Sequence, residues 1–291
     1  MPELPEVETM RRGIAPIVGG RIISVQRTPC RLKPITVSPP LRTFRARALQ
    51  RQVQAVERWG KRVVLRLDDQ AAIVFEPRMT GLVLLEAPPD HQHLRFRLGL
   101  TGVAAGQLCF WDRRGLGSVR LLEMAELQSR YGPGQLGPDA LQISRAQLRD
   151  RLSPSRRAIK VALLDQQTLA GIGNLYASEI LHVAGLHPAT PCDRLTRLQW
   201  QRLHAAMRAV LEEAIRYEGS TLADGTYRNA LNHRGRYQQH HRVYARECQR
   251  CPTCGRGTVQ RLVQAQRATF FCPSCQGKGA DGEEARRNAS G

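Results

Sequence analysis

The sequence is poor in acidic residues, poorer still in lysine, and contains no long apolar run. Without a run of about eighteen apolar residues, a conventional membrane-spanning helix is excluded. The first residues also lack the basic and apolar regions of a secretory signal. We therefore expect a cytoplasmic protein with no membrane partner. In the cytoplasm its eight cysteines are expected to be reduced or metal-bound instead of paired in disulfides.

The shortage of acid leaves a large positive charge. Lysine and arginine number 44 against 25 aspartates and glutamates, which gives a formal net charge of +19 and a pI near 10.7. Such an imbalance favours a polyanionic partner, and nucleic acid fits better than an anionic membrane surface. Between Arg228 and Arg267 nine arginines face a single acid, Glu247, so this stretch is a candidate for phosphate binding. A solvated basic surface is the alternative.

Lysine occurs at only four positions, Lys33, Lys61, Lys160 and Lys278. If this chain uses arginine at every position that needs only a positive charge, a remaining lysine can mark a site that needs a compact ammonium or a titratable amine. Chance retention is the competing explanation, and we prefer it for Lys33 and Lys278.

The chain opens with Met1-Pro-Glu-Leu-Pro-Glu-Val-Glu-Thr. Removal of Met1 would leave Pro2 as a secondary amine beside the carboxylate of Glu3. An α-amino group titrates near about 7.7–8.0, so part of it is an unprotonated nucleophile at neutral pH. Its adduct with an aldehyde-like carbon is a cationic iminium that favours elimination. An ordinary helix start, with proline and acids in the first turn, is the alternative reading.

Apolar periodicity changes along the chain. A helix is predicted over residues 5–15, and strands over 21–26, 61–67, 71–75, 81–85, 94–98, 107–111 and 118–122. After a Gly/Pro-rich segment around residues 131–138, helices are predicted over 144–152, 159–166, 175–184 and 197–217. Strands followed by helices indicate an α+β fold with a sandwich or barrel first. We place the boundary near residues 135–150 and expect the polar tail 279–291 to be disordered.

Four cysteines form a C-x₂-C-x₁₇-C-x₂-C array of Cys251, Cys254, Cys272 and Cys275. Two such knuckles present four thiolates to one zinc ion, and four protein ligands leave no open position. The metal is therefore expected to be structural, and no other cofactor is needed. Cys248 is close in sequence, but the spacing prefers Cys251. Cys30, Cys109 and Cys192 are expected to be small buried residues.

A glycine-bearing turn precedes the helix predicted over residues 175–184, and it contains Gly171, Gly173 and Asn174. A glycine-bearing turn at a helix start exposes backbone N–H groups to an anion, although many such turns are only caps. Arg156, Arg157 and Lys160 provide a basic context for this turn.

Together these motifs resemble the formamidopyrimidine-DNA glycosylase family, bacterial repair enzymes for oxidised purines such as 8-oxoguanine and ring-opened purines. The resemblance spans roughly residues 1–277. It rests on the opening motif, Leu136-Gly-Pro-Asp, Ala170-Gly-Ile-Gly-Asn-Leu-Tyr-Ala-Ser-Glu and Gln266-Arg-Ala-Thr-Phe-Phe-Cys. It implies a catalytic β-sandwich with an N-terminal helix over 1–135, a helix-two-turn-helix domain over 136–240 and a zinc β-hairpin over 241–278.

The resemblance also implies roles for individual residues. Pro2 would attack C1′ of the damaged nucleotide, Glu3 would shuttle protons and Glu6 would support the site, while Lys61 and Arg267 would act near phosphate. The positions that would contact the DNA backbone are His91, Arg156, Lys160 and Asn174. After the damaged base leaves the stack, the hole would be filled by Met79, Arg114 and Leu116. The expected partner is damaged double-stranded DNA, bound by a monomer that needs no nucleotide cofactor.

Three departures from the family pattern concern specificity. Leu116 replaces an aromatic wedge, Glu76-Pro-Arg-Met-Thr-Gly replaces the common Leu-Gly-Met-Ser/Thr-Gly ending, and Ala223 stands where lysine is common. One alternative is an endonuclease-VIII-like enzyme for oxidised pyrimidines, although those begin Pro-Glu-Gly-Pro. Another is a zinc-stapled DNA-binding protein without catalysis. The presence of Pro2, Glu3 and Lys61 together argues against this alternative.

Overall fold

The computed structural model describes residues 2–277, which divide into two compact units. The first unit runs to Gln135 and also contains Ala214–Gln238, and the second contains Leu136–Glu213 and the chain from Gln239 onward. Residues 214–238 thus pack with the N-terminal unit although they follow helices of the second. The sequence-based division at 135/136 and 240/241 stays a prediction, and the tail 279–291 lies outside the described residues.

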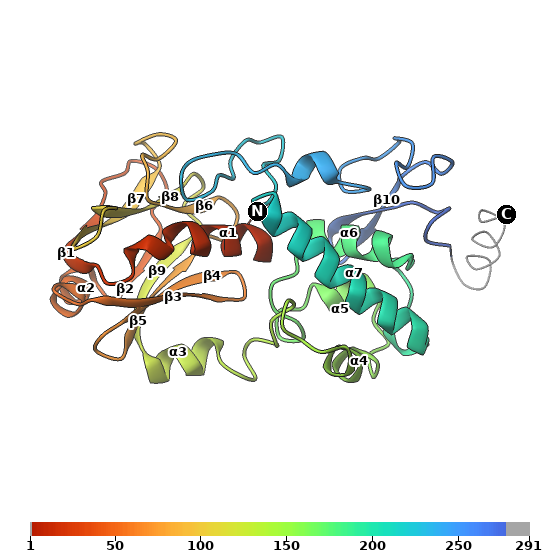
Figure 1. Ribbon diagram of the computed structural model, residues 1–291, viewed down its shortest axis with the longest axis horizontal. Coiled ribbons are helices and arrows are strands. Elements are labelled where there is room, and N and C mark those ends of the chain that lie inside the picture. Colours follow the sequence, from red (N-terminus) through yellow and green to blue (C-terminus); the bar gives the residue numbers. More distant parts are fainter. Residues whose placement is uncertain (1, 278–291) are drawn as a thin grey trace. The chain divides into compact units, whose positions relative to one another are not determined.

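The first unit contains two β-sheets (Figure 1). One sheet has the order β1 (Arg21–Arg27), β7 (Leu94–Thr101), β8 (Gln107–Asp112) and β6 (Gly81–Leu84). The other has the order β2 (Thr36–Ser38), β9 (Ser118–Glu123), β5 (Ala71–Glu76), β4 (Arg62–Leu67) and β3 (Val53–Trp59). All neighbouring strands are antiparallel except β2 and β9, which are parallel.

Aromatic residues fill the space between the sheets. Phe75 of β5 contacts Phe110 of β8 and Phe96 of β7, with ring centroids 5.7 and 6.4 Å apart. Phe44 of helix α2 (Leu41–Ala48) packs edge-on against Phe96 at 5.3 Å. Four of the six phenylalanines therefore meet in one core, which explains how a chain poor in aromatics forms a sandwich.

Strand β5 is buried along its whole length because both of its faces are covered. Ile73 and Phe75 face the core between the sheets. Ala72 and Val74 face a second apolar cluster with Leu127 of helix α3 (Met124–Tyr131). A central strand covered on both sides produces a continuous apolar run, as the sequence has here.

Helix α1 (Leu4–Ile14) contacts β3 and β4 of one sheet and β6 of the other, and lies between the two layers in Figure 1. Its apolar face enters the core through Val7, Met10 and Ile14. The 3₁₀ turn η1 (Ala15–Ile17) continues it. This packing fixes the direction of the helix and hence the place of the residues at its beginning.

The second unit contains helices and a β-hairpin. Its helices are α4 (Arg145–Leu152), α5 (Ile159–Leu163), α6 (Asn174–Ala184) and α7 (Arg197–Arg216), of which the last three residues are grouped with the first unit. Short 3₁₀ helices are η2 (Cys192–Arg194) and η3 (Tyr237–His240), and the hairpin strands are β10 (Gln260–Gln264) and β11 (Arg267–Phe271). Residues 164–173 form two turns between α5 and α6.

These elements confirm the predicted α+β class: a β-sandwich with an N-terminal helix, a helix-two-turn-helix domain and a C-terminal four-cysteine hairpin. No helix within residues 2–277 has both the length and the hydropathy required to span a membrane.

Candidate functional site

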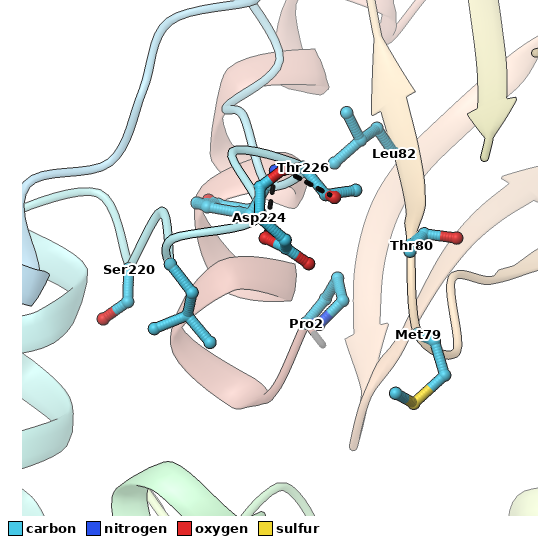
Figure 2. A pocket seen from close by; sticks show the side chains of 9 residues that line it. Pro2, Met79, Thr80, Leu82, Ser220, Asp224 and Thr226 are labelled. Carbon is cyan, nitrogen blue, oxygen red and sulfur yellow. Dashed lines mark hydrogen bonds between the residues drawn. The ribbon is translucent and has the colours of Figure 1, made fainter. Parts of the chain in front are cut away.

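Pro2 lies buried at the beginning of α1 and lines a small pocket of the first unit. The other lining residues are Met79, Thr80, Leu82, Ser220, Leu222, Asp224, Thr226 and Tyr227. Figure 2 shows Pro2 with Met79 and Thr80 on one side and Asp224 and Thr226 on the other. The N–H of Thr226 donates to Asp224 Oδ1 at 3.1 Å, which orders this part of the loop. The pocket wall thus combines an imino acid, hydroxyls, a carboxylate and aliphatic groups.

Glu6 links the beginning of α1 to the loop that follows α7. Its Oε2 accepts the N–H of Glu3 at 2.9 Å, and its Oε1 accepts the N–H of Ser220 at 2.9 Å. Gly219, with φ +78°, lies so close that a Cβ there would come within 2.8 Å of Glu6 Oε1. Glu6 therefore fixes the backbone immediately after Pro2, and a glycine is needed beside it.

Tyr227, which also lines the Pro2 pocket, contacts Glu6 as well. Its hydroxyl donates to the backbone oxygen of Glu6 at 3.4 Å. Burial, and next the nearby negative charge of Glu6, raise the pKa of Tyr227 well above its usual value, so the phenol stays neutral. Glu3 directly follows Pro2 in the chain, and it is buried, with only 3% of its surface exposed.

Lys61 occupies the tip of the β3–β4 hairpin, where Gly60 (φ +58°) and Lys61 form a two-residue turn. The side chain is half-buried and is not among those lining the Pro2 pocket. His91 is exposed in the connection between β6 and β7.

The three residues expected to fill a hole in DNA lie on two connections of the same sandwich. Met79 is 38% exposed in the turn between β5 and β6. Arg114 and Leu116 lie between β8 and β9; Arg114 is exposed and Leu116 is 36% exposed.

In the second unit, Lys160 and Asn174 meet the zinc hairpin. Lys160 is fully buried, and its Nζ donates to Asn174 Oδ1 at 2.7 Å and to Thr269 Oγ1 at 2.7 Å. Asn174 Nδ2 donates to the backbone oxygen of Ala268 at 2.9 Å. These bonds tie α5, the beginning of α6 and β11 together next to Arg267, which is exposed at the first position of β11. Arg156, by contrast, is exposed in the connection between α4 and α5.

Glu179 is the last residue of the Ala170-Gly-Ile-Gly-Asn-Leu-Tyr-Ala-Ser-Glu motif, but the sequence assigned it no role; it lies on α6 and is completely buried. Its carboxylate accepts the N–H groups of Arg242, Val243 and Tyr244 at 2.9, 2.9 and 2.8 Å. Burial raises the pKa of Glu179, although the three N–H donors and the charge of Arg242 oppose the shift. Glu179 therefore anchors the segment that leads into the cysteine array.

The four cysteines of the array fit one tetrahedral zinc ion. Their Sγ atoms all lie within 4.8 Å of one another. The pairs Cys251–Cys275 and Cys254–Cys272 are 3.9 and 3.7 Å apart. Zinc–sulfur bonds of about 2.3 Å in a tetrahedron require sulfurs about 3.8 Å apart. These residues form a single zinc-binding site, as the spacing predicted.

The surroundings of the cluster support this use. Burial would raise the pKa of the Cys254 thiol, but the backbone N–H groups of Gly257 and Arg256 outweigh it and lower the pKa to about 6. Burial, and then proximity to the other sulfurs, raises the pKa of Cys275, a repulsion that a divalent cation removes. A Cβ on Gly257 would come within 2.6 Å of Cys272 Sγ, so the knuckle requires glycine there.

The remaining cysteines are outside the cluster. Cys248 is exposed and is not part of it. Cys109 and Cys192 are buried, as predicted. The same prediction was wrong for Cys30, which is half-buried beside the guanidinium of Arg95 in an irregular segment. An isolated cysteine in a sequence does not show whether a loop will cover it.

The sandwich, the two-turn connection between α5 and α6, and the four-cysteine hairpin define a zinc-binding protein of the helix-two-turn-helix class. Two family models match the chain: the formamidopyrimidine-DNA glycosylase N-terminal domain over residues 1–119, and the formamidopyrimidine-DNA glycosylase H2TH domain over residues 136–225. The chain belongs to the formamidopyrimidine-DNA glycosylase family.

Individual relatives agree over nearly the whole length. The formamidopyrimidine-DNA glycosylase of Chloroflexus aurantiacus is 40% identical over 281 residues, covering 95% of this chain and 98% of the relative. The crystal structure of MutM (Fpg) from Thermus thermophilus has a TM-score of 0.82 at 37% identity, covering 96% of this chain and 100% of that one. Lactococcus lactis Fpg in complex with DNA containing an abasic site has a TM-score of 0.82 at 30% identity, covering 95% and 100%.

Proposed function

We propose that this protein excises oxidised purines from double-stranded DNA and then cleaves the strand at the resulting abasic site, with Pro2 as the nucleophile. The observation that carries the proposal is the burial of Pro2 in the wall of a pocket, next to Glu3 and Glu6, in a chain of this family. A related protein has been crystallised with DNA containing the ring-opened purine Fapy-dG, and another complex contains abasic-site DNA.

The chemistry begins with the amine of Pro2 once Met1 has been removed. The unprotonated nitrogen attacks C1′ of the damaged nucleotide, and the base leaves with the bonding electron pair. Displacement first gives an adduct in which the Pro2 nitrogen is bonded to C1′ and loses its proton. The C1′–O4′ bond of the sugar ring then breaks and O4′ takes up a proton, which leaves a cationic iminium between Pro2 and the opened sugar. A secondary amine leaves no N–H on this iminium, so the cation cannot be neutralised by losing a proton there. The positive charge instead acidifies the neighbouring C–H bond, and β- and then δ-elimination release the phosphates on both sides of the sugar.

The residues around Pro2 take supporting roles. Glu3 transfers protons to and from the sugar during ring opening. Glu6 positions the attacking nitrogen, because its carboxylate holds both the N–H of Glu3 and that of Ser220. Lys61, at the tip of its hairpin, provides an ammonium near the phosphate and the proton transfers of elimination.

Residues of both units contact the phosphate backbone of the DNA. We assign phosphate contacts to the exposed residues His91, Arg156 and Arg267. Since Lys160 has no exposed surface, ordering Asn174 and the hairpin beside Arg267 fits its position better than a direct phosphate contact. Zinc supplies no reaction step, because four cysteines occupy its coordination sites; when bound, it stabilises the hairpin that presents Arg267.

The target base must be flipped out of the duplex, and Met79, Arg114 and Leu116 would occupy its place. Leu116 is shorter and less flat than an aromatic wedge, so it stacks less well on the neighbouring bases. We further place the protein in the bacterial cytoplasm, where chromosomal DNA lies, and expect it to act as a monomer.

The proposal is tested by single-turnover excision on matched duplexes that contain 8-oxoguanine, a ring-opened purine or an oxidised pyrimidine. We expect both purine lesions to be excised faster than the pyrimidine, and borohydride to trap a covalent complex during each reaction. A preference for the pyrimidine would contradict the substrate class, and excision without a trapped complex would contradict the mechanism.

A terminal extension separates chemistry from binding. An alanine retained before Pro2 converts the amine into an amide, which should abolish trapping but leave most of the duplex affinity, since phosphate contacts are independent of the amine. The matched control carries the same alanine after Gly291 and should trap normally. A trapped complex formed by the N-terminally extended protein would assign the nucleophile to a lysine instead.

A further inference from the structure

Asp112 is a buried carboxylate for which the proposed mechanism has no use. It is the last residue of β8, and it is 0% exposed. Its Oδ2 accepts the N–H of Gly117 at 2.7 Å, and its Oδ1 accepts the N–H of Arg114 at 3.2 Å. The carboxylate therefore holds the connection 113–117 from both ends. A buried charge without such bonds would be strongly destabilising.

Thr80 extends this bond network to a second connection. Its hydroxyl donates to Asp112 Oδ1 at 2.5 Å and accepts the N–H of Arg114 at 3.0 Å. Thr80 is 5% exposed and directly follows Met79. Next in the chain, Gly81 pairs with Asp112 in the β6–β8 ladder, so strand register brings the hydroxyl and the carboxylate together. A short hydrogen bond to a carboxylate is among the stronger kinds.

The backbone around this pair has little freedom to rearrange. The N–H of Gly81 closes the turn on Pro77 O at 2.8 Å, and a Cβ on Gly81 would come within 2.5 Å of Pro77 Cα. From the other side, the buried guanidinium of Arg95 donates through Nε to the backbone oxygen of Asp112 at 2.8 Å. The main-chain positions of Thr80 and Asp112 are thus fixed independently of their side chains.

We infer that Thr80 and Asp112 form a latch that joins the turn carrying Met79 to the connection carrying Arg114 and Leu116. The latch holds the side chains of Met79, Arg114 and Leu116 in one fixed arrangement. They therefore enter the duplex together where a base has been flipped out. Thr80 and Asp112 are positioning residues, since they act through the three side chains and touch no reacting atom. This inference rests on the proposed function, and it assigns to the latch the discrimination of the base opposite the lesion.

Replacement of Thr80 by valine tests the latch, because valine keeps the shape of threonine and removes the hydroxyl. The assay is single-turnover excision of an oxidised purine placed opposite each of the four bases. We expect Thr80→Val to reduce the ratio between the preferred and the least preferred opposite base by about tenfold, the effect of one buried hydrogen bond to a charged group. Thr80→Ser, which keeps the hydroxyl, should restore most of the ratio. Thr43→Val, at an exposed position of α2, is the matched control and should leave it unchanged.

Strand cleavage at an abasic site in single-stranded DNA serves as the internal comparison, because no opposite base and no hole exist there. Because Thr80 also lines the Pro2 pocket, Thr80→Val should slow this reaction, but by a smaller factor than it slows excision opposite the preferred base. An equal loss in both assays would overturn the positioning role, because it would indicate general damage to the pocket. Full opposite-base discrimination by Thr80→Val would overturn the inference as well.

Amide hydrogen exchange tests the latch without reference to activity. In Thr80→Val, the N–H of Arg114 should exchange faster, while the N–H of Gly117, held by the other carboxylate oxygen, should keep its protection. Unchanged exchange at Arg114 would refute the latch itself. If wild-type protein excises no lesion at all, the proposed function fails, whereas the exchange result still decides whether the latch exists.

Discussion

Replacement of Glu8 by glutamine tests how the helix that begins beside Pro2 is anchored. Glu8 accepts hydrogen bonds from Arg11 Nη2 at 2.8 Å, Arg12 Nε at 2.8 Å and, across to β3, Arg58 Nε at 3.1 Å. Burial would raise the pKa of Glu8, but the bonds and charges of these arginines outweigh it and lower the pKa from 4.5 to about 2. Ionised Glu8 therefore stabilises the folded state.

The size of this stabilisation follows from linkage. The lowering of the Glu8 pKa from 4.5 to about 2 corresponds to about 3 kcal/mol, and screening at the largely exposed Arg12 reduces this stabilisation to about 2 kcal/mol. Because the folded pKa is the lower one, the contribution is complete above pH 4.5 and is lost as the pH falls toward about 2. Glu8→Gln should therefore lower the free energy of unfolding by about 2 kcal/mol at neutral pH and by about 1 kcal/mol less at about pH 3.5.

The assay is urea-induced unfolding in a Trp200→Phe background. Of the three tryptophans, Trp59 and Trp111 then remain, and both belong to the first unit, so fluorescence reports that unit alone. Glu86→Gln is the control, since Glu86 is exposed in the same unit and its replacement should change the free energy of unfolding by under about 0.5 kcal/mol. A Glu8→Gln effect that is the same at both pH values, or that grows on acidification, would refute the charge-based reasoning.

Three further predictions concern the second unit. Cys272→Ser should reduce bound zinc from one equivalent per chain to a small fraction and weaken duplex binding, as measured by metal analysis and DNA titration; retention of stoichiometric zinc would contradict the four-cysteine site. Lys160→Met should lower the stability of this unit by about 2–4 kcal/mol, because Asn174 and Thr269 lose a buried cationic donor; Trp200 fluorescence during unfolding measures it, and an unchanged midpoint would count against the network. Glu179→Gln should cost about 2–3 kcal/mol and accelerate amide exchange at residues 242–244, since a carboxamide has one oxygen where three N–H groups need acceptors; preserved protection would show that these amides have other acceptors.

The fold could be predicted wherever burial imposes a repeating pattern. Strand β5 and helix α6 were predicted to within one residue at each end, because their apolar residues follow the period of the element. Edge strand β3 and helices α2 and α3 were missed. β3 carries Gln54, Glu57 and Arg58 among its apolar residues, and an edge strand exposes enough surface to tolerate them. Helix α5 was predicted to reach residue 166 but ends at Leu163. Just beyond it, the carboxylate of Asp165 accepts the N–H of Gln167 and the hydroxyl of Thr168, which favours a turn.

The candidate site could be predicted where chemistry fixes the spacing between ligands, as in the four-cysteine array. The Glu6–Ser220 contact, the Glu179 anchor and the Thr80–Asp112 latch could not be predicted, because each joins residues that are far apart in the sequence. Thr80 and Asp112 are 32 positions apart, and Glu179 and Val243 are 64 apart. Only strand register and helix packing bring such pairs together, and neither can be derived from the local sequence.

Mass-spectrometric mapping of the borohydride-reduced complex is the most direct test of the central claim. The DNA remnant should be found on the N-terminal peptide, attached to the nitrogen of Pro2, in protein from which Met1 has been removed. A remnant on Lys61, or fully active protein that retains Met1, would contradict the account.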